Sequence, residues 1–190
     1  KVVDQITYSS YSKIIGISKG TAKSLIRSYP FLSKKVQIIN NGAHLFFKKF
    51  VTRTSAAKVI IMSVGRLHPS KNYETAINSL VSIKDLNFEY WIAGIGELEE
   101  ELKAQVKSLG LQDTVKFLGY VSDIPSLLKK ADIFLIPSKW EGFGLAAVEA
   151  MNASLPCVVS NVPGLGDLIE KDGKDAFLVS PSNEKIITQR

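Results

Sequence analysis

The sequence has few of the residues that build covalent or metal-based frameworks. Among its 190 residues there are one cysteine, Cys157, and two histidines. A single cysteine excludes a disulfide within the chain and a zinc site built from several cysteines. The scarcity of cysteine is compatible with a reducing compartment, and we expect a cytoplasmic protein.

Long hydrophobic runs are also missing. No stretch approaches the roughly 20 apolar residues of a membrane-spanning helix, and the chain begins at Lys1 without a signal-peptide pattern. Hydrophobic residues make up 45% of the chain, which is typical of a globular protein and not of a disordered one. Because domains commonly contain about 100 to 150 residues, we expect one domain plus a fragment of another, cut from a longer protein.

Acidic residues are nearly absent from the first part of the chain. Residues 1–53 contain ten basic residues and one acidic residue, Asp4, whereas the rest contains 14 basic and 17 acidic residues. The net charge of +6 is therefore the sum of two regions of opposite net charge, which we assign to different surfaces. No nucleic-acid-binding motif accompanies the basic residues, and we expect no nucleic acid partner. A solvated basic face and contact with an anionic membrane both stay open, the latter worth about 1 kcal/mol per basic residue.

Short β-branched runs alternate with amphipathic stretches along the chain, which is typical of βαβ units around a parallel sheet. We therefore predict an α/β fold: a doubly wound, Rossmann-like parallel sheet with ligands beyond the carboxyl ends of its strands. Residues 1–42 are predicted to be a strand-helix-strand remnant of a preceding domain, residues 43–57 a linker, and residues 58–190 the main domain. The predicted strands are 14–18, 36–40, 58–64, 90–93, 114–117, 132–136, 157–160 and 176–179, and the predicted helices are 20–28, 73–83, 98–109, 124–130 and 145–152.

The first candidate site follows the predicted strand 58–64. The turn GRLHPSKN, residues 65–72, carries Arg66 and Lys71 and leads into a helix. A turn at the carboxyl end of a strand can direct both cations toward one ligand. The planar fork of Arg and the mobile charge of Lys suit the two phosphates of a diphosphate. On these residues alone, a pair of solvated surface charges is an equally good interpretation.

The second candidate site lies where the predicted strand 132–136 passes into a helix. In the segment EGFGL, residues 141–145, the glycines allow close approach of the backbone to a ligand, and the helix start offers free N–H groups for an anion. Glu141 stands at this turn and Glu149 lies two turns along the helix, roughly 12 Å away by helical rise. Two such carboxylates can accept hydrogen bonds from hydroxyls at opposite ends of one ligand. Alternatively, they are a helix N-terminal charge and a solvated side chain, although the apolar neighbours of Glu149 favour a bound partner.

Two further turns follow predicted strands. Gly94 and Gly96 precede a helix, but Glu99 occupies the third glycine position of a dinucleotide fingerprint, so we interpret them as a tight turn with its backbone exposed to the cleft. Tyr120 and Val121 follow the next strand, where an aromatic ring beside backbone amides could hold a nucleobase. A surface tyrosine is the more common outcome.

These motifs, taken together and in order, resemble the signature of glycosyltransferase family 4. The resemblance spans about residues 36–182, and its most specific element is the pair Glu141 and Glu149 with seven residues between them. It implies a GT-B fold. This chain would then hold the C-terminal, donor-binding half, truncated at its C-terminus, and residues 1–42 would be the tail of the N-terminal acceptor domain.

The resemblance also implies an activity and a set of site residues. A retaining enzyme of this kind transfers a hexosyl group from a nucleoside diphosphate sugar to an acceptor hydroxyl. Arg66 and Lys71 would neutralise the diphosphate in place of a metal ion, so we expect no metal and no other cofactor. Glu149 would accept hydrogen bonds from the ribose, and Glu141 would contact the donor sugar. The implied catalytic residues are Arg66, Lys71 and Glu141, and the implied donor-binding residues are Gly65, Gly94, Gly96, Tyr120, Val121, Gly142, Phe143, Gly144, Leu145 and Glu149.

The implied partners are a nucleotide sugar and a glycan or lipid-linked acceptor, the latter held mainly by the missing N-terminal domain. We therefore expect the isolated chain to bind nucleotide without transferring sugar. A basic acceptor half would allow peripheral contact with the cytoplasmic face of a membrane. Two alternatives stay open, namely a non-catalytic nucleotide-sugar-binding or assembly module and a sugar-nucleotide epimerase of the same fold. The segment Val162-Pro163-Gly164 departs from the glycine-rich turn of the family, which leaves contacts from that loop undefined.

Overall fold

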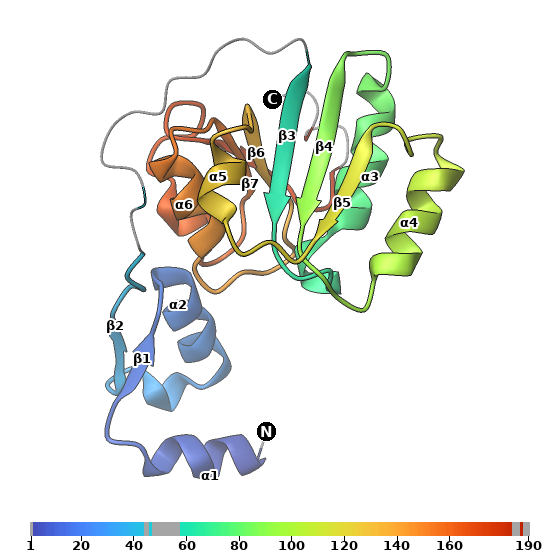
Figure 1. Ribbon diagram of the computed structural model, residues 1–190. Coiled ribbons are helices and arrows are strands. Elements are labelled where there is room, and N and C mark those ends of the chain that lie inside the picture. The colour runs from blue at the N-terminus through green and yellow to red at the C-terminus, as the bar shows by residue number, and fades with distance from the viewer. Residues whose placement is uncertain (1, 44–45, 47–57, 184–186, 188–190) are drawn as a thin grey trace.

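A six-stranded parallel sheet forms the core of the larger of two lobes in the computed structural model (Figure 1). The structure describes residues 2–43, 46, 58–183 and 187. The strand order is β5-β4-β3-β6-β7-β8, so the chain moves outward in one direction from β3 and then in the other from β6. The strands are β3 (Val59–Val64), β4 (Phe88–Ala93), β5 (Val115–Gly119), β6 (Ile133–Ile136), β7 (Cys157–Ser160) and β8 (Phe177–Val179).

Helices cover both faces of this sheet, as a doubly wound fold requires (Figure 1). Successive strand residues point to opposite faces: Ile61 packs with residues of α3 and α4, whereas Met62 packs with residues of α5 and α6. Both faces are therefore buried, which explains the nearly continuous apolar runs of the strands. The helices of this lobe are α3 (Tyr73–Leu80), α4 (Glu99–Ser108), α5 (Ile124–Leu128) and α6 (Leu145–Asn152), and the 3-10 turns are Pro69–Lys71, Val81–Ile83 and Gly166–Leu168.

The predicted fold class is confirmed, and all six predicted strands of the main domain are present. The bounds of α6 and β7 agree with the sequence prediction. β4 begins two residues earlier than predicted, at Phe88, and α5 ends two residues earlier, at Leu128. Cys157 is buried on β7, and burial raises the pKa of its thiol to about 12. The thiol therefore stays protonated at neutral pH.

The smaller lobe consists of α1 (Val2–Ser10), β1 (Ile14–Gly16), α2 (Lys19–Ser28), a 3-10 turn (Pro30–Leu32) and β2 (Val36–Ile38). β1 and β2 pair in parallel, as expected for a strand-helix-strand unit. α2 begins at a capping box in which Ser18 and Thr21 satisfy each other's backbone N–H groups. The sequence analysis did not predict α1.

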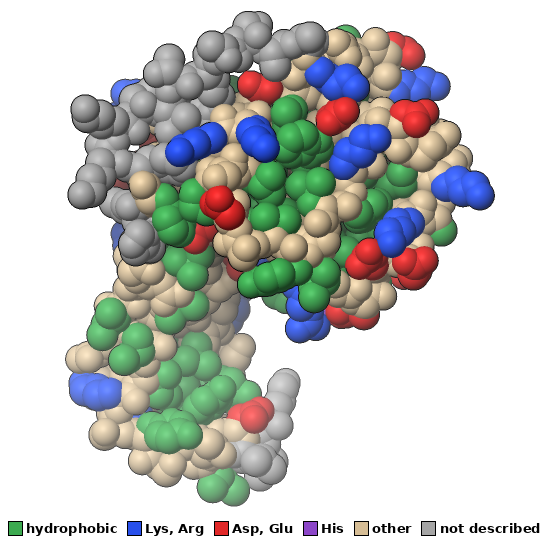
Figure 2. Space-filling view, in the orientation of Figure 1, with side chains coloured by type: hydrophobic (Ala, Val, Ile, Leu, Met, Phe, Trp, Pro, Cys, Tyr) green, Lys and Arg blue, Asp and Glu red, His purple; other side chains and the backbone are tan. Residues whose placement is uncertain are grey.

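Hydrophobic side chains gather on the smaller lobe on the face shown in Figure 2. Ile15 and Ile38, on the two paired strands, are both at least half exposed. Two strands alone cannot bury an apolar face, so this surface is open in the chain as described. The segment 43–57, predicted as a linker, lies outside the described residues except for 43 and 46.

The two lobes touch where the start of α2 meets the loop after β7. The backbone N–H of Gly20 donates to Oδ2 of Asp167. A Cβ atom on Gly20 would overlap the backbone at Gly164, and one on Gly164 would overlap the carbonyl oxygens of Glu141 and Gly142. Three backbone segments therefore stack at van der Waals distance here. Within the described residues, no helix is both long enough and apolar enough to cross a membrane.

Candidate functional site

The candidate site lies where the strand order reverses, between the neighbouring strands β3 and β6. Ligands of open α/β sheets bind at such a switch point, beyond the carboxyl ends of the strands. The loop 65–72 leaves β3 and the loop 137–144 leaves β6. Together with the first two turns of α6 they line a cavity of about 420 Å³. The motifs in the two loops each predict a ligand-binding turn, and the fold places these turns side by side.

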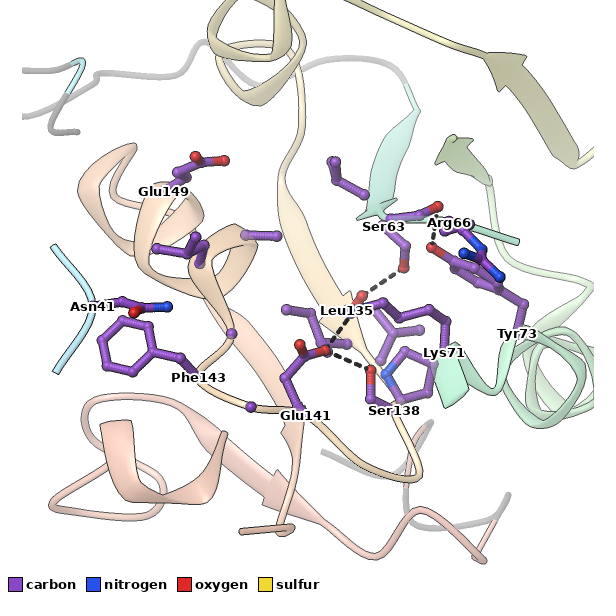
Figure 3. Close-up of a pocket in the computed structure, with 18 of the residues that line it drawn as sticks. Asn41, Ser63, Arg66, Lys71, Tyr73, Leu135, Ser138, Glu141, Phe143 and Glu149 are labelled. Carbon is purple, nitrogen blue, oxygen red and sulfur yellow. Dashed lines mark hydrogen bonds and ion pairs between the residues drawn. The ribbon is translucent and has the colours of Figure 1, made fainter. Parts of the chain in front are cut away.

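An ion pair joins the two loops inside this cavity (Figure 3). Lys71 Nζ lies 2.5 Å from Glu141 Oε2, with side-chain exposures of 26% and 18%. The fully buried Ser138 places its Oγ 3.4 Å from the same carboxylate oxygen. A lysine ammonium has three donors, so Lys71 can keep Glu141 and still donate to an anionic ligand.

Buried polar contacts fix the backbone that carries Lys71. Asn72 adopts the left-handed conformation (φ 56°, ψ 35°) and is buried. Its Nδ2 donates to the carbonyl oxygens of Pro137, at 2.9 Å, and Pro181, at 2.8 Å. The backbone N–H of Lys139 donates to Ser70 O at 2.8 Å. Loop 65–72 is thus tied to the loop after β6 at two points, which holds Lys71 against Glu141.

Arg66 borders the cavity but is more exposed than Lys71. Its side chain is 65% exposed and lies 3.5 Å from Glu97 Oε1. Glu97 is also 3.7 Å from Nε2 of His68. A hydrogen bond from its own backbone N–H lowers the pKa of Glu97, and the positive charge of Arg66 lowers it further. An exposed ion pair of this kind contributes little to stability, so Arg66 can turn toward a ligand at small energetic cost.

The start of α6 offers backbone N–H groups to the same cavity. Gly144 has φ 90°, a conformation that favours glycine, and its Cβ position is filled by Leu165. Its carbonyl accepts from the N–H groups of Ala147 and Val148. Within the described residues, the N–H groups of Leu145 and Ala146 have no acceptor. These amides and the positive end of the helix dipole favour an anion at this point.

Glu149 lines the cavity from the second turn of α6, whereas Glu141 lines it from the loop before this helix (Figure 3). Its partial burial raises the pKa of its carboxyl group. Within the described residues the carboxyl group of Glu149 has no hydrogen-bond partner, so its acceptor capacity is available to a ligand with hydroxyl donors.

This raised pKa gives a testable pH dependence for Glu149→Gln. The Glu149 carboxyl keeps its proton to a higher pH in the folded state than in the unfolded state. The contribution of the neutral carboxyl to folding stability is therefore lost as the pH rises through the folded-state pKa. Glutamine has no charge to desolvate. We therefore expect the variant to gain melting temperature relative to the unmodified protein between pH 4 and pH 8, by a small amount because the group is partly solvated.

Thermal unfolding at several pH values, with ligand absent, measures this difference. Glu170→Gln, which changes an exposed glutamate, serves as the control and should show no such trend. A constant difference between Glu149→Gln and the unmodified protein across this range would contradict the assigned desolvation.

The structure brings most of the predicted site residues to one cavity. Those that line it are Gly65, Arg66, Lys71, Glu141, Gly142, Phe143, Gly144, Leu145 and Glu149. The other four do not line it. The side chain of Tyr120 is 77% exposed, and Val121 packs against the sheet face that α5 and α6 cover.

Gly94 and Gly96 pack against the loop that carries Arg66. A Cβ atom on Gly94 would overlap the carbonyl oxygen of Gly65, and one on Gly96 would overlap that of Leu67. Two backbone hydrogen bonds of 3.0 Å, Gly65 N to Ala93 O and Leu67 N to Ile95 O, accompany this close approach. In this structure these two glycines support the site from outside the cavity.

Sequence reasoning missed two cavity residues from the smaller lobe, Ile17 and Asn41. Figure 3 shows Asn41 beside Phe143, and a Cβ atom on Gly142 would lie 3.1 Å from Ile17 Cδ1. Asn40-Asn41-Gly42 is a combination typical of turns, but no local signal in the sequence reveals that this turn faces α6. Within the described residues, no cluster of three or more His, Cys, Asp or Glu side chains is arranged to hold a metal ion.

Known proteins resemble this chain in sequence and in fold. A family model described as "Glycosyl transferases group 1" matches residues 45–190. UDP-Gal:alpha-D-GlcNAc-diphosphoundecaprenol alpha-1,3-galactosyltransferase of Escherichia coli is 36% identical in an alignment of 155 positions that covers 78% of this chain and 38% of that protein. Mannosylfructose-phosphate synthase of Agrobacterium fabrum is 30% identical in an alignment of 201 positions that covers 95% of this chain and 44% of that protein.

Among solved structures, Anabaena Alr3699/HepE in complex with UDP-glucose aligns with a TM-score of 0.85 and 25% identity over 99% of this chain and 56% of that chain. TarM of S. aureus, with a TM-score of 0.81 and 21% identity over 100% of this chain and 39% of that chain, shares the fold. The chain thus spans about half, or less, of the length of the proteins that it matches.

Proposed function

Because the chain belongs to the glycosyl transferases group 1 family, we propose that it carries the donor site of a retaining glycosyltransferase. The donor is a nucleoside diphosphate sugar, and a hexosyl group passes to an acceptor hydroxyl. The observation that carries this proposal is the cavity at the switch point, where Lys71, Arg66 and the start of α6 gather positive charge while Glu141 and Glu149 supply acceptors for hydroxyl groups.

In this proposal the diphosphate lies between loop 65–72 and the start of α6. Lys71 and Arg66 donate to the phosphate oxygens, as do the N–H groups of Leu145 and Ala146. Protein cations thus neutralise the leaving group in place of a metal ion. Such fixed charges lower the barrier most when they act on charge that develops in the transition state.

Glu149 accepts hydrogen bonds from the ribose, and Glu141 contacts the donor sugar. During transfer the bond between the anomeric carbon and the phosphate oxygen breaks, and its electron pair stays on the diphosphate. The acceptor oxygen bonds to the anomeric carbon through an oxocarbenium-like transition state, on the same face of the sugar. The acceptor proton passes to the departing phosphate oxygen, so that atoms and charge balance.

The acceptor side of the proposal rests on the relatives. One is named for a diphosphoundecaprenol-linked substrate, and we propose a glycan or lipid-linked acceptor here as well. Because the relatives are about twice as long as this chain, we propose that the isolated chain binds nucleotide and does not transfer sugar. Contact of the basic smaller lobe with an anionic membrane stays a prediction.

Titration calorimetry with UDP, GDP and ADP, each in Mg²⁺ and in EDTA, tests the donor site. We expect at least one of these nucleotides to bind, with the same affinity in both buffers, because Lys71 and Arg66 supply the positive charge. Failure of all three to bind would overturn the proposed donor site. Binding that EDTA abolishes would overturn its metal-free character.

A further inference from the structure

A second groove borders the donor cavity on the side of the smaller lobe. It has a volume of about 480 Å³ and lies between α2 and the loop that carries Trp140. We call it the α2 groove. Glu141 and Gly142 line both this groove and the donor cavity. A molecule in the α2 groove therefore lies next to the segment 141–142, which also borders the donor cavity.

The walls of the α2 groove differ in chemistry. Trp140 is 57% exposed, so its apolar ring is open to a ligand in the groove. Leu25 and Pro163 continue this apolar surface. Ser24 and Ser28, one helical turn apart on α2, add two hydroxyls to the lining. Within the described residues, neither hydroxyl nor the indole N–H of Trp140 has a hydrogen-bond partner.

Tyr29 closes one end of the α2 groove in a fixed orientation. Its hydroxyl donates to Asp4 Oδ2 at 2.8 Å. Its ring makes edge contacts with Tyr8, at a centroid distance of 5.1 Å, and with Phe31, at 6.2 Å. Helix α1 supplies Asp4 and Tyr8, so it preorganises this end of the groove.

Two cations lie on the neighbouring face of α2. Lys23 and Arg27 are exposed, one turn apart, and line a groove of about 540 Å³ that shares Ser24 and Pro163 with the α2 groove. Within the described residues neither forms an ion pair. Asp167 also lines this second groove, but its Oδ2 accepts from the backbone N–H of Gly20. The two cations thus favour an anionic group next to whatever occupies the α2 groove.

We propose that the α2 groove is an acceptor subsite for a sugar that carries a phosphate or diphosphate. The apolar face of the pyranose ring lies on Trp140, and its hydroxyl edge faces Ser24 and Ser28. The phosphate lies on Lys23 and Arg27, and the reacting hydroxyl points toward Glu141. This inference rests on the proposed function, because only a transferase needs an acceptor at this position.

Tryptophan fluorescence tests the subsite directly. The chain has two tryptophans, so Trp91→Phe leaves Trp140 as the only reporter. Glucose 1-phosphate, glucose and inorganic phosphate are titrated separately, each with and without saturating UDP. We expect a saturable change with glucose 1-phosphate that persists in UDP, and at least tenfold weaker binding of glucose or phosphate alone. Complete displacement of glucose 1-phosphate by UDP would place it in the donor cavity and overturn the subsite.

Substitutions test the sugar-binding surface at Trp140 and the phosphate-binding cations Lys23 and Arg27 separately. Binding is measured by ligand-observed NMR. We expect Trp140→Ala to weaken glucose 1-phosphate binding at least tenfold and Trp140→Phe to keep it within about threefold, because phenylalanine retains the apolar ring face. Lys23→Ala with Arg27→Ala should weaken the phosphorylated sugar and leave glucose unchanged. Tyr11→Ala and Lys84→Ala, which alter exposed residues outside both grooves, are the controls. Unchanged binding in Trp140→Ala with an intact melting temperature would overturn the proposal.

A final arm distinguishes a soluble acceptor from a lipid-linked one. Vesicles that display a glycosyl diphosphate on a polyprenol are compared with vesicles of phosphatidylglycerol alone. Binding to the glycosylated vesicles above soluble glucose 1-phosphate indicates a lipid-linked acceptor, and equal binding indicates a soluble one. Equal binding to both kinds of vesicle would show charge attraction alone and overturn the subsite. Calorimetry with UDP, GDP and ADP is independent of these results. Failure of the subsite therefore leaves the donor site standing, and failure of all three nucleotides to bind removes the donor site by itself.

Discussion

Lys71→Ala is expected to weaken UDP binding by about 1.5 to 3 kcal/mol, the usual worth of a hydrogen bond to a charged group. This corresponds to roughly a 10- to 150-fold higher dissociation constant. Among the cavity residues, Lys71 is the cation that is both half-buried and fixed, because Asn72 and Ser70 tie its loop to the loop after β6. A charge held in place before binding loses little entropy when the ligand arrives.

The substitution also changes Glu141. Without Lys71, the Glu141 carboxylate lies in the cavity with the distant Ser138 hydroxyl as its remaining side-chain donor. An unpaired, partly buried carboxylate is unfavourable, and it would repel a diphosphate. The loss of affinity therefore combines a missing attraction with a new repulsion.

A double-mutant cycle separates these two contributions. Glu141→Gln removes the negative charge, so in that background Lys71→Ala should reduce UDP affinity by the direct contact alone. Lys139→Ala, an exposed lysine in the same loop as Glu141, is the matched control for the change in net charge. If Lys71→Ala and Lys139→Ala have the same effect on calorimetric affinity, Lys71 is not part of the donor site.

The main sheet was predictable because its strands are buried on both faces. The runs 157–159 and 133–136 are apolar throughout and are bounded by polar residues or proline, which indicates a strand without information from its neighbours. The boundaries that shifted depend on pairing: β4 extends back to Phe88 because that residue pairs with Val59 of β3. Helix α1 was missed because it is short, at nine residues, and its described side chains are mostly exposed, so packing gives little signal in the sequence.

The two loops of the candidate site were also predictable. In a parallel sheet all carboxyl ends lie at one edge, so residues after different strands meet there. The contribution of Ile17 and Asn41 was not predictable, since it depends on how the smaller lobe sits against α6. The roles of Gly94 and Gly96 were predictable only in part. The sequence indicates close backbone approach at these glycines, but it does not identify whether the neighbour is a ligand or another loop.

Gly94→Ala is expected to lower the free energy of unfolding by about 2 to 4 kcal/mol, through overpacking and backbone strain together. For a chain of this size the melting temperature should fall by roughly 5 to 15 °C. The added Cβ would overlap the carbonyl oxygen of Gly65, at the centre of the sheet edge. Neither backbone can move freely, because Gly65 N donates to Ala93 O and Gly94 N donates to Gly119 O.

Gly94→Ala should also affect the donor site, because Gly65 begins the loop that carries Arg66 and Lys71. If the overlap is relieved by displacing Gly65, UDP affinity falls along with stability. Gly110→Ala is the matched control: Gly110 also has a positive φ, of 69°, but its Cβ position is open. In Gly110→Ala the backbone is strained but the added Cβ meets no other atom. This variant should therefore lose less stability than Gly94→Ala and keep its UDP affinity. Equal losses of melting temperature in both variants, with unchanged UDP affinity, would show that the contact between Gly94 and Gly65 does not position the site.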